Sequence, residues 1–197
     1  MAAPTPSPEV AAETACPAAP TAACEPEVPR EAEAARAKGP KTFSAYALSK
    51  CIVGYGIING IINAAIFAGI HAGAPDARFR FGDVAHDMAL TGALLGILLF
   101  VIVVPLTKAD FRKGRFAGPV EGDQLAPLPR SFALATVVMG AIGLVAAVGI
   151  AEAACLALPL PLDVTGMMLL KGVCCATVGC LSGYFTISWA VRASEGR

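Results

Sequence analysis

Four apolar stretches, each close to the length of a lipid bilayer, constrain the fold of this 197-residue chain more than any other feature. They cover residues 45–72, 88–106, 132–158 and 164–191, and clusters of Gly, Pro and charged residues separate them. A helix needs about 20 mostly apolar residues to cross a hydrocarbon core of about 30 Å. The sequence therefore predicts an all-α fold, a polytopic membrane protein with a four-transmembrane-helix bundle in residues 44–192.

The composition agrees with a membrane protein and argues against several other classes. Only 15% of the residues are charged, whereas soluble domains carry about 25%. The formal net charge is +0, so the basic surface of a nucleic-acid-binding protein is absent. The sequence contains no Walker A loop, H-E-x-x-H, G-x-S-x-G or dinucleotide-binding motif. We expect no cofactor, no nucleic-acid partner and no enzymatic activity, although an intramembrane enzyme stays open.

The two ends of the chain differ from its apolar middle. Residues 1–43 are rich in Ala, Pro and Glu, and the first 40 contain no aromatic residue. Such a segment cannot bury enough apolar surface to offset the entropy of ordering, so we predict a disordered tail. It lacks the basic and apolar segments of a signal peptide, and we expect the first span to direct insertion. Residues 193–197 form a short C-terminal tail.

The distribution of Lys and Arg predicts the orientation in the membrane. Basic residues gather in loops on the cytoplasmic side of membrane proteins. One side holds Lys38, Lys41, Lys50, Lys108, Arg112, Lys113, Arg115, Arg130, Arg192 and Arg197, and the other holds Arg78, Arg80 and Lys171. We therefore expect a multi-pass protein of the bacterial cell membrane with both termini in the cytoplasm.

Two amides give the first span a polar face. Asn59 and Asn63 are four residues apart and share one side of a helix, beside Gly56 and Gly60. Unpaired amides are costly in hydrocarbon, so both side chains should point into the bundle. They either form interhelical hydrogen bonds or line a polar path or small-molecule site. Possible partners on the other spans are Thr91, Thr136, Thr177, Ser182, Tyr184 and Thr186.

Two opposite charges lie within the last two spans. Glu152 comes late in the third span and Lys171 early in the fourth, so both should lie toward the outer leaflet. Charged groups in such positions are candidates for function. They could form a structural ion pair across the hairpin, or take part in proton transfer or substrate binding.

Small residues spaced four apart recur in three spans. The pairs are Gly56 and Gly60, Gly92 and Gly96, and Gly179 and Gly183. In apolar helices this spacing marks close helix crossing, within the bundle or between protomers. Pro105 predicts a bend or an end of the second span, and Asp163 a cap for the fourth. The seven cysteines bracket no extracellular loop, and we interpret them as packing residues.

Four polar residues around the first outer loop are weak candidates for metal ligands. They are His71, Asp83, His86 and Asp87. No third ligand stands in a fixed relation to any pair of them, so we expect helix capping and solvation at the interface rather than a metal site.

The segments KCIVGYGIINGIINAAIF (50–67) and DMALTGALLG (87–96) resemble a loose group of uncharacterised bacterial four-helix membrane proteins, some of them labelled permease. This resemblance implies no substrate and no catalytic residue. Two functions therefore remain open. The chain could be a small oligomeric transporter or channel, with Asn59, Asn63, Glu152 and Lys171 along a polar path. Alternatively, it could be a non-transporting scaffold or accessory subunit that binds a membrane partner protein.

Overall fold

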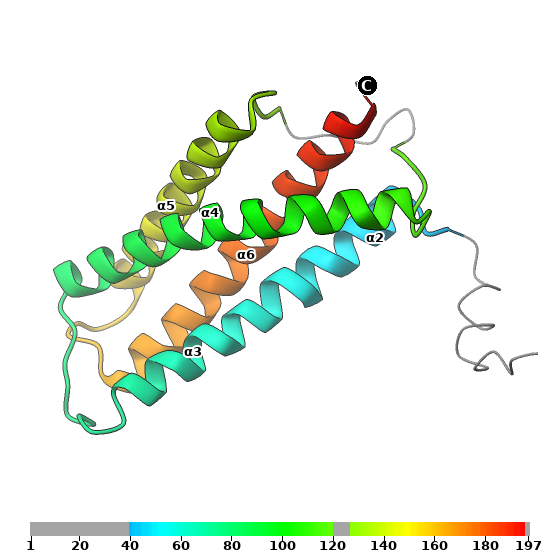
Figure 1. Cartoon of the computed structure of the whole chain (residues 1–197). Helices are drawn as coiled ribbons and strands as arrows, with labels where there is room; N and C mark the ends of the chain where they lie inside the picture. Colours follow the sequence, from blue (N-terminus) through cyan, green and yellow to red (C-terminus); the bar gives the residue numbers. More distant parts are fainter. Residues whose placement is uncertain (1–39, 120–126, 196–197) are drawn as a thin grey trace, which may run out of the picture. The chain divides into compact units, whose positions relative to one another are not determined.

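The computed structural model describes residues 40–119 and 127–195. For Glu195 it describes the backbone alone. Disorder is predicted for residues 1–43, of which 1–39 lie outside the described residues. For the last of them the prediction is wrong, because Thr42 caps α2 and Phe43 is a buried residue of that helix. The helices are α2 (Phe43–Ser49), the π-helical η1 (Lys50–Ile57), α3 (Ile58–Ile70), α4 (Phe81–Arg112), α5 (Phe132–Ala157) and α6 (Val164–Glu195). Successive spans run in opposite directions (Figure 1).

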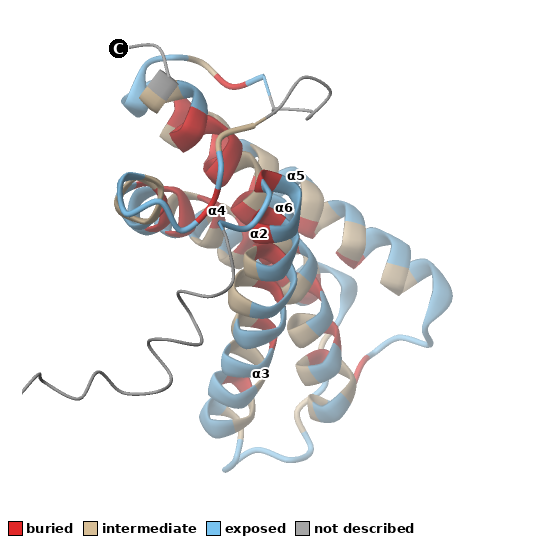
Figure 2. Cartoon of the chain, turned by 90° about the vertical axis from the view of Figure 1, so that its right-hand side faces the viewer, coloured by how far each residue is buried: buried red, intermediate tan, exposed pale blue. Residues whose placement is uncertain are grey.

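Four helical segments are long and apolar enough to cross a membrane. They are Phe43–Ile70, which combines α2, η1 and α3, then Phe81–Arg112, Phe132–Ala157 and Val164–Ser194. The all-α fold and the four spans are therefore confirmed, and the chain is a multi-pass membrane protein. In Figure 2 the buried residues lie where helices face each other, and the exposed residues lie around them. The outward surface carries large apolar side chains such as Ile61, Ile70 and Val145.

The second span extends well beyond its predicted bounds. α4 continues through Pro105 to Arg112. The prediction that the span ends near Leu106 because of this proline is therefore wrong. Membrane helices tolerate a proline because the lost backbone hydrogen bond can be compensated locally. At the other end, the Asp83 carboxylate accepts a hydrogen bond from the backbone N–H of Arg80 at 2.9 Å and caps the helix. At about 1.5 Å per residue, α4 is about 48 Å long, so both of its ends leave the hydrocarbon core.

The third and fourth spans are separated where the sequence predicts. α5 ends at Ala157, because Leu158 adopts the extended conformation favoured before a proline. The Asp163 side chain accepts a hydrogen bond from the backbone N–H of Gly166 at 2.7 Å. This confirms Asp163 as the N-cap of α6.

A π-helical segment in the first span, η1, was not predicted. The buried small residues of this span are Ala47, Cys51, Gly56 and Gly60, at steps of four, five and four residues. An α-helix returns to one face after three or four residues, whereas a π turn accommodates a step of five. Cys51 and Gly56, on either side of the five-residue step, both lie in η1 and both face Cys180 of α6. The π turn therefore keeps both halves of the span against α6.

α6 occupies the centre of the bundle. It packs against η1 and α3, against α4, and to a smaller extent against α5, while α4 and α5 form a second close interface. The largest fully buried side chains include Phe100 and Met88 from α4, Met139 from α5, and Met167 and Ile187 from α6. α3 packs mainly on α6, which leaves one long flank of the first span exposed.

Candidate functional site

The two amides of the first span are bonded within their own helix. The side-chain N–H of Asn59 donates to the carbonyl of Tyr55 at 2.7 Å, and that of Asn63 donates to the carbonyl of Asn59 at 2.9 Å. Both side chains are partly buried. Of the hydroxyls that the sequence offered on other spans, those of Thr136, Thr177 and Thr186 donate to carbonyls of their own helices. The hydrogen bonds of both amides thus lie within the first span, and the interhelical hydrogen bonds expected from the sequence stay a prediction.

Glycines close the interface between the first span and α6. A methyl group added at Gly179 would overlap the carbonyl oxygen of Tyr55, and one at Gly183 would meet the ring of the same tyrosine. On the facing side, Gly56 lies against Cys180, and Gly60 lies against Gly172 and Ala176 of α6. All four predicted glycines of these two spans thus lie at one helix crossing within the chain.

The α4–α5 interface is closed by glycines from both helices. Gly92 lies against Gly143 and Ala147, and Gly96 lies against the backbone of Met139 and Gly140. Gly140 and Gly143 did not stand out in the sequence, because they are three residues apart rather than four. The facing glycines bring the two backbones into contact and leave no room for a polar path along this interface.

Lys171 pairs with α4 and not with the third span. Its ammonium lies 2.8 and 2.7 Å from the two carboxylate oxygens of Asp87. The Lys171 side chain is 12% exposed and that of Asp87 is 37% exposed. Glu152 is exposed on α5 and forms no ion pair with any residue that the structure describes. The expected pairing of Glu152 with Lys171 is wrong, because α6 presents Lys171 to α4.

An aromatic cluster begins beside this ion pair. The Lys171 ammonium lies 5.5 Å from the centre of the Phe67 ring, close enough for a cation–π interaction. Phe67 stacks on His71 with ring centres 4.2 Å apart, and Phe79 lies 5.5 Å from Phe67. Phe79 also exchanges two backbone hydrogen bonds with Leu162, at 2.8 and 3.0 Å. These contacts join the α3–α4 loop to the α5–α6 loop next to the pair.

The four weak candidates for metal ligands have separate roles. Asp83 caps α4, Asp87 pairs with Lys171, and His71 lies 3.0 Å from the carbonyl oxygen of Phe67 through its Nδ1. His86 is exposed. Within the described ranges, no three His, Cys, Asp or Glu residues gather in a geometry that could hold a metal ion.

At the opposite end of the bundle, Asp110 connects α4 to the first span. Its carboxylate accepts a hydrogen bond from the Tyr46 hydroxyl at 2.8 Å and lies 3.0 Å from Arg115 and 3.7 Å from Lys50. Phe116 stacks on Tyr46 with ring centres 4.1 Å apart. The turn after α4 is thereby fixed against α2. The sequence did not identify this cluster, because its members come from three separate segments.

The predicted polar set does not form one site. Asn59 and Asn63 lie together on α3, Lys171 is bound to Asp87, and Glu152 is exposed on α5. No family model, curated protein or solved structure matches this chain. Its function therefore has to be inferred from its own geometry.

Proposed function

We propose that this protein is a non-transporting membrane scaffold that self-associates along the Asn59–Asn63 edge of α3. The hydrogen bonding and the partial exposure of the two amides support this proposal. Each uses one N–H on its own helix, and each is partly exposed on a flank that other spans leave uncovered. Polar side chains at such positions promote helix association in a bilayer, because hydrocarbon offers them no hydrogen bonds.

A second copy of the chain is the partner that fits this edge. An Asn side chain has two N–H donors and an acceptor oxygen, so the same edge on another copy complements it. A two-fold interface uses one surface twice and closes as a dimer. The exposed isoleucines of the same span, including Ile58, Ile62 and Ile66, would pack beside the amides.

The distribution of charge argues against the transporter alternative. A transport path needs polar groups that face a common space. Here the Lys171 charge is neutralised by Asp87, and Glu152 lies on the outer face of α5. Glycine contacts close both main helix interfaces. These features favour a scaffold whose binding surface lies on the outside.

Energy transfer between donor-labelled and acceptor-labelled copies in liposomes tests the association. We expect transfer that falls as the protein is diluted into more lipid, and a loss of most of it in the double variant Asn59→Leu/Asn63→Leu. The matched control is Thr136→Val/Thr177→Val, because these two hydroxyls also donate to carbonyls four residues back on other helices, at 2.9 Å each. Equal transfer by the Asn variant and the parent would overturn the proposal.

Flux measurements on the same proteoliposomes test the alternative. We expect no protein-dependent flux across a panel of ions and small metabolites. A flux that the parent supports and the Asn double variant abolishes would make the protein a transporter or channel and contradict the scaffold proposal.

We also infer that the end of the bundle carrying Lys41, Lys113 and Arg130 faces the cytoplasm, following the rule that basic loops stay inside. In a variant without native cysteines, we expect a membrane-impermeant thiol reagent to label Asp76→Cys in intact cells and to leave Lys113→Cys unlabelled. Both positions are exposed, at opposite ends. The reverse labelling would invert the orientation.

A further inference from the structure

The outer face of α5 carries an acidic side chain within its apolar surface. Glu152 is exposed, and it lies between the two most exposed large apolar side chains of the helix, Val145 at 67% and Leu156 at 90%. Exposed apolar residues continue beyond the end of α5, at Leu158 and Leu160. The carboxylate therefore lies inside the apolar band of the surface and not beyond its edge.

The pairing of α4 and α5 gives the depth of Glu152. Ala147 of α5 lies against Gly92 of α4, and the two helices run in opposite directions (Figure 1). Glu152 follows Ala147 by five residues and Asp87 precedes Gly92 by five, so both lie about 7.5 Å from this contact toward the same end. Glu152 is thus level with the Lys171–Asp87 pair. With 26 residues, α5 is about 39 Å long, so Glu152 stays inside a hydrocarbon core of about 30 Å that is centred on the helix.

The direction of the Glu152 side chain keeps its charge away from the headgroups. Side chains tilt toward the N-terminus of their helix, and Glu152 lies near the C-terminal end of α5. Its carboxylate therefore leans toward the middle of the membrane. Long lysine and arginine side chains can extend to the membrane surface, whereas a glutamate is too short to do so against this tilt. A charged group in hydrocarbon is costly unless a partner satisfies it.

The lysine and arginine side chains of this end of the chain do not supply that partner. Lys171 is bound by Asp87. Arg78 and Arg80 precede α4, outside the spans, and form no ion pair with Glu152. A second copy of the chain offers the same three cations. A different protein is therefore the more suitable source of a cation at this depth.

The same side of α5 borders an open apolar groove of about 400 Å³. The groove is lined by Val138, Ala141, Ile142, Val145 and Ala146 of α5 and by Leu181 of α6. Val138, Val145 and Glu152 are seven residues apart, about two turns, and so share one side of the helix. Gly149 lies between the last two, and a methyl group added to it would meet no atom within 4 Å. Small residues beside a groove allow another helix to approach closely.

We propose that this face of α5 binds a transmembrane helix of a partner protein that carries a lysine or arginine at the level of Glu152. The apolar side of the partner helix fills the groove, and its cation pairs with the Glu152 carboxylate. A basic residue within a membrane helix needs a counter-charge as much as Glu152 does, so the two charges select each other. This surface is separate from the Asn59–Asn63 edge of α3. It adds a partner to the proposed scaffold and does not depend on self-association.

A synthetic transmembrane peptide tests the proposal. It consists of leucine and alanine with uncharged polar ends, a dansyl group, and one lysine a quarter of its length from each end. Either orientation of insertion then places a lysine at the level of Glu152. Energy transfer from Trp189, the only tryptophan in the chain, to the dansyl group reports binding to the full-length protein in phosphatidylcholine liposomes. We expect saturable transfer that exceeds the transfer to a matched peptide with leucine at both lysine positions.

Two variants test the charge and the shape of the face separately. Glu152→Gln should weaken binding of the lysine peptide about tenfold, since a polar contact between membrane helices contributes to association. Its control, Asp76→Asn, removes an exposed carboxylate from the loop at the same end and should stay within about twofold of the parent. Gly149→Leu should also weaken binding, because it obstructs the face without a clash inside the chain. Its control is Gly69→Leu, which fills equally open space on α3.

Three results would overturn the proposal. Equal transfer to the lysine and leucine peptides, or equal affinity of Glu152→Gln and the parent, would show that no cation is recognised. A loss of energy transfer between labelled copies of the chain in Glu152→Gln would make a second copy the occupant. The Asn59→Leu/Asn63→Leu variant keeps the α5 face and should bind the peptide as the parent does, so a failure of self-association would leave this proposal standing. Unchanged circular dichroism of the variants would show that they remain folded.

Discussion

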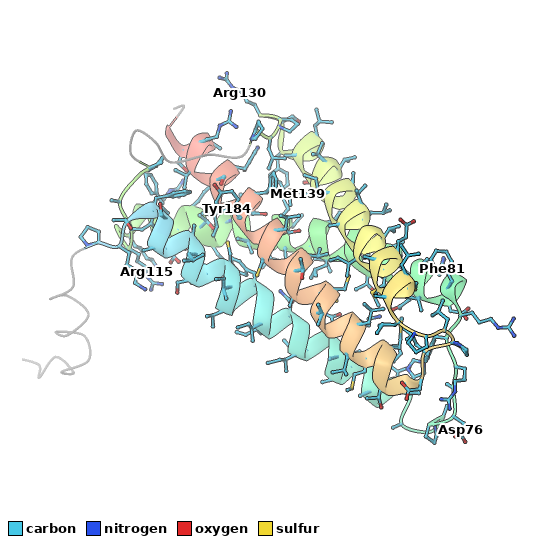
Figure 3. The ribbon with its side chains drawn as sticks, turned by 180° about the vertical axis from the view of Figure 1, so that it is seen from behind. Asp76, Phe81, Arg115, Arg130, Met139 and Tyr184 are labelled. Carbon is cyan, nitrogen blue, oxygen red and sulfur yellow. The ribbon has the colours of Figure 1, made fainter. Side chains whose placement is uncertain are left out.

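The two ends of the bundle handle their charges in opposite ways. At the end where α4 and α6 begin, one cation, Lys171, is held by one carboxylate, Asp87, under aromatic rings. At the other end, the basic side chains outnumber the carboxylates whose side chains are described, and Lys113, Arg115 and Arg130 are exposed. Figure 3 shows the separation, with Asp76 and Phe81 labelled at one end and Arg115 and Arg130 at the other. At one end the described charges form a structural ion pair, and at the other several cations lie at the surface.

This difference indicates which end contributes more to stability and which end attracts anions from the membrane surface. A shielded pair contributes through the cost of breaking it, because the remaining charge would lie without a partner in an apolar environment. Accessible cations contribute little to folding but attract anions from the membrane surface. Substitutions in the Lys171–Asp87 pair should therefore change stability most, whereas substitutions of exposed cations at the other end should change it little.

The largest effect is expected for Asp87→Leu. It leaves the 12%-exposed Lys171 without a counterion, and we expect a loss of about 3 kcal/mol in the free energy of unfolding. Unfolding in detergent, followed by circular dichroism during titration with a denaturing detergent, measures this loss.

A double variant separates the charge effect from lost packing. Asp87→Leu/Lys171→Met should recover most of the stability, since no unpaired charge remains. Asp76→Leu serves as the control, because Asp76 is exposed in the loop at the same end. If the double variant were as unstable as Asp87→Leu, the pair would not be the source of the effect.

An intermediate effect is expected for Asp110→Asn at the other end. The amide oxygen can still accept the Tyr46 hydroxyl, but the attraction to Arg115 and Lys50 is lost. We expect a loss of about 1 kcal/mol, because both cations are substantially exposed and solvent screens them. The same unfolding titration measures it. A loss equal to that of Asp87→Leu would remove the contrast between the two ends.

The fold could be predicted largely from the sequence because the membrane restricts the possibilities. The lengths of the apolar stretches and the position of Asp163 were enough to place four helices. The end of α4 was misplaced because Pro105 was taken as a boundary, although a capped helix with polar ends can continue past it. The π segment could not be predicted, because its five-residue step appears only once the buried residues Ala47, Cys51, Gly56 and Gly60 are known.

The candidate site was much less predictable. Spacing along one helix correctly brought Asn59 and Asn63 together, because four residues make about one turn. It could not say which helices are neighbours, and that decides whether Lys171 meets Glu152 or Asp87. The Asp110 cluster depends on the beginning of α2 and the end of α4 lying side by side, which no local sequence pattern predicts.

The smallest effect is expected for Glu152→Gln, and it tests the pairing that the sequence suggested. Glu152 is exposed on α5, and the Lys171 ammonium is already bound by both carboxylate oxygens of Asp87. An exposed charge without a partner contributes little, so we expect a change within about 0.5 kcal/mol in the unfolding titration. A loss comparable to that of Asp87→Leu would mean that Lys171 shares its charge between α4 and α5. The end where α6 begins would then be a three-helix charge network rather than a closed pair, and Lys171 would again be a candidate for transport.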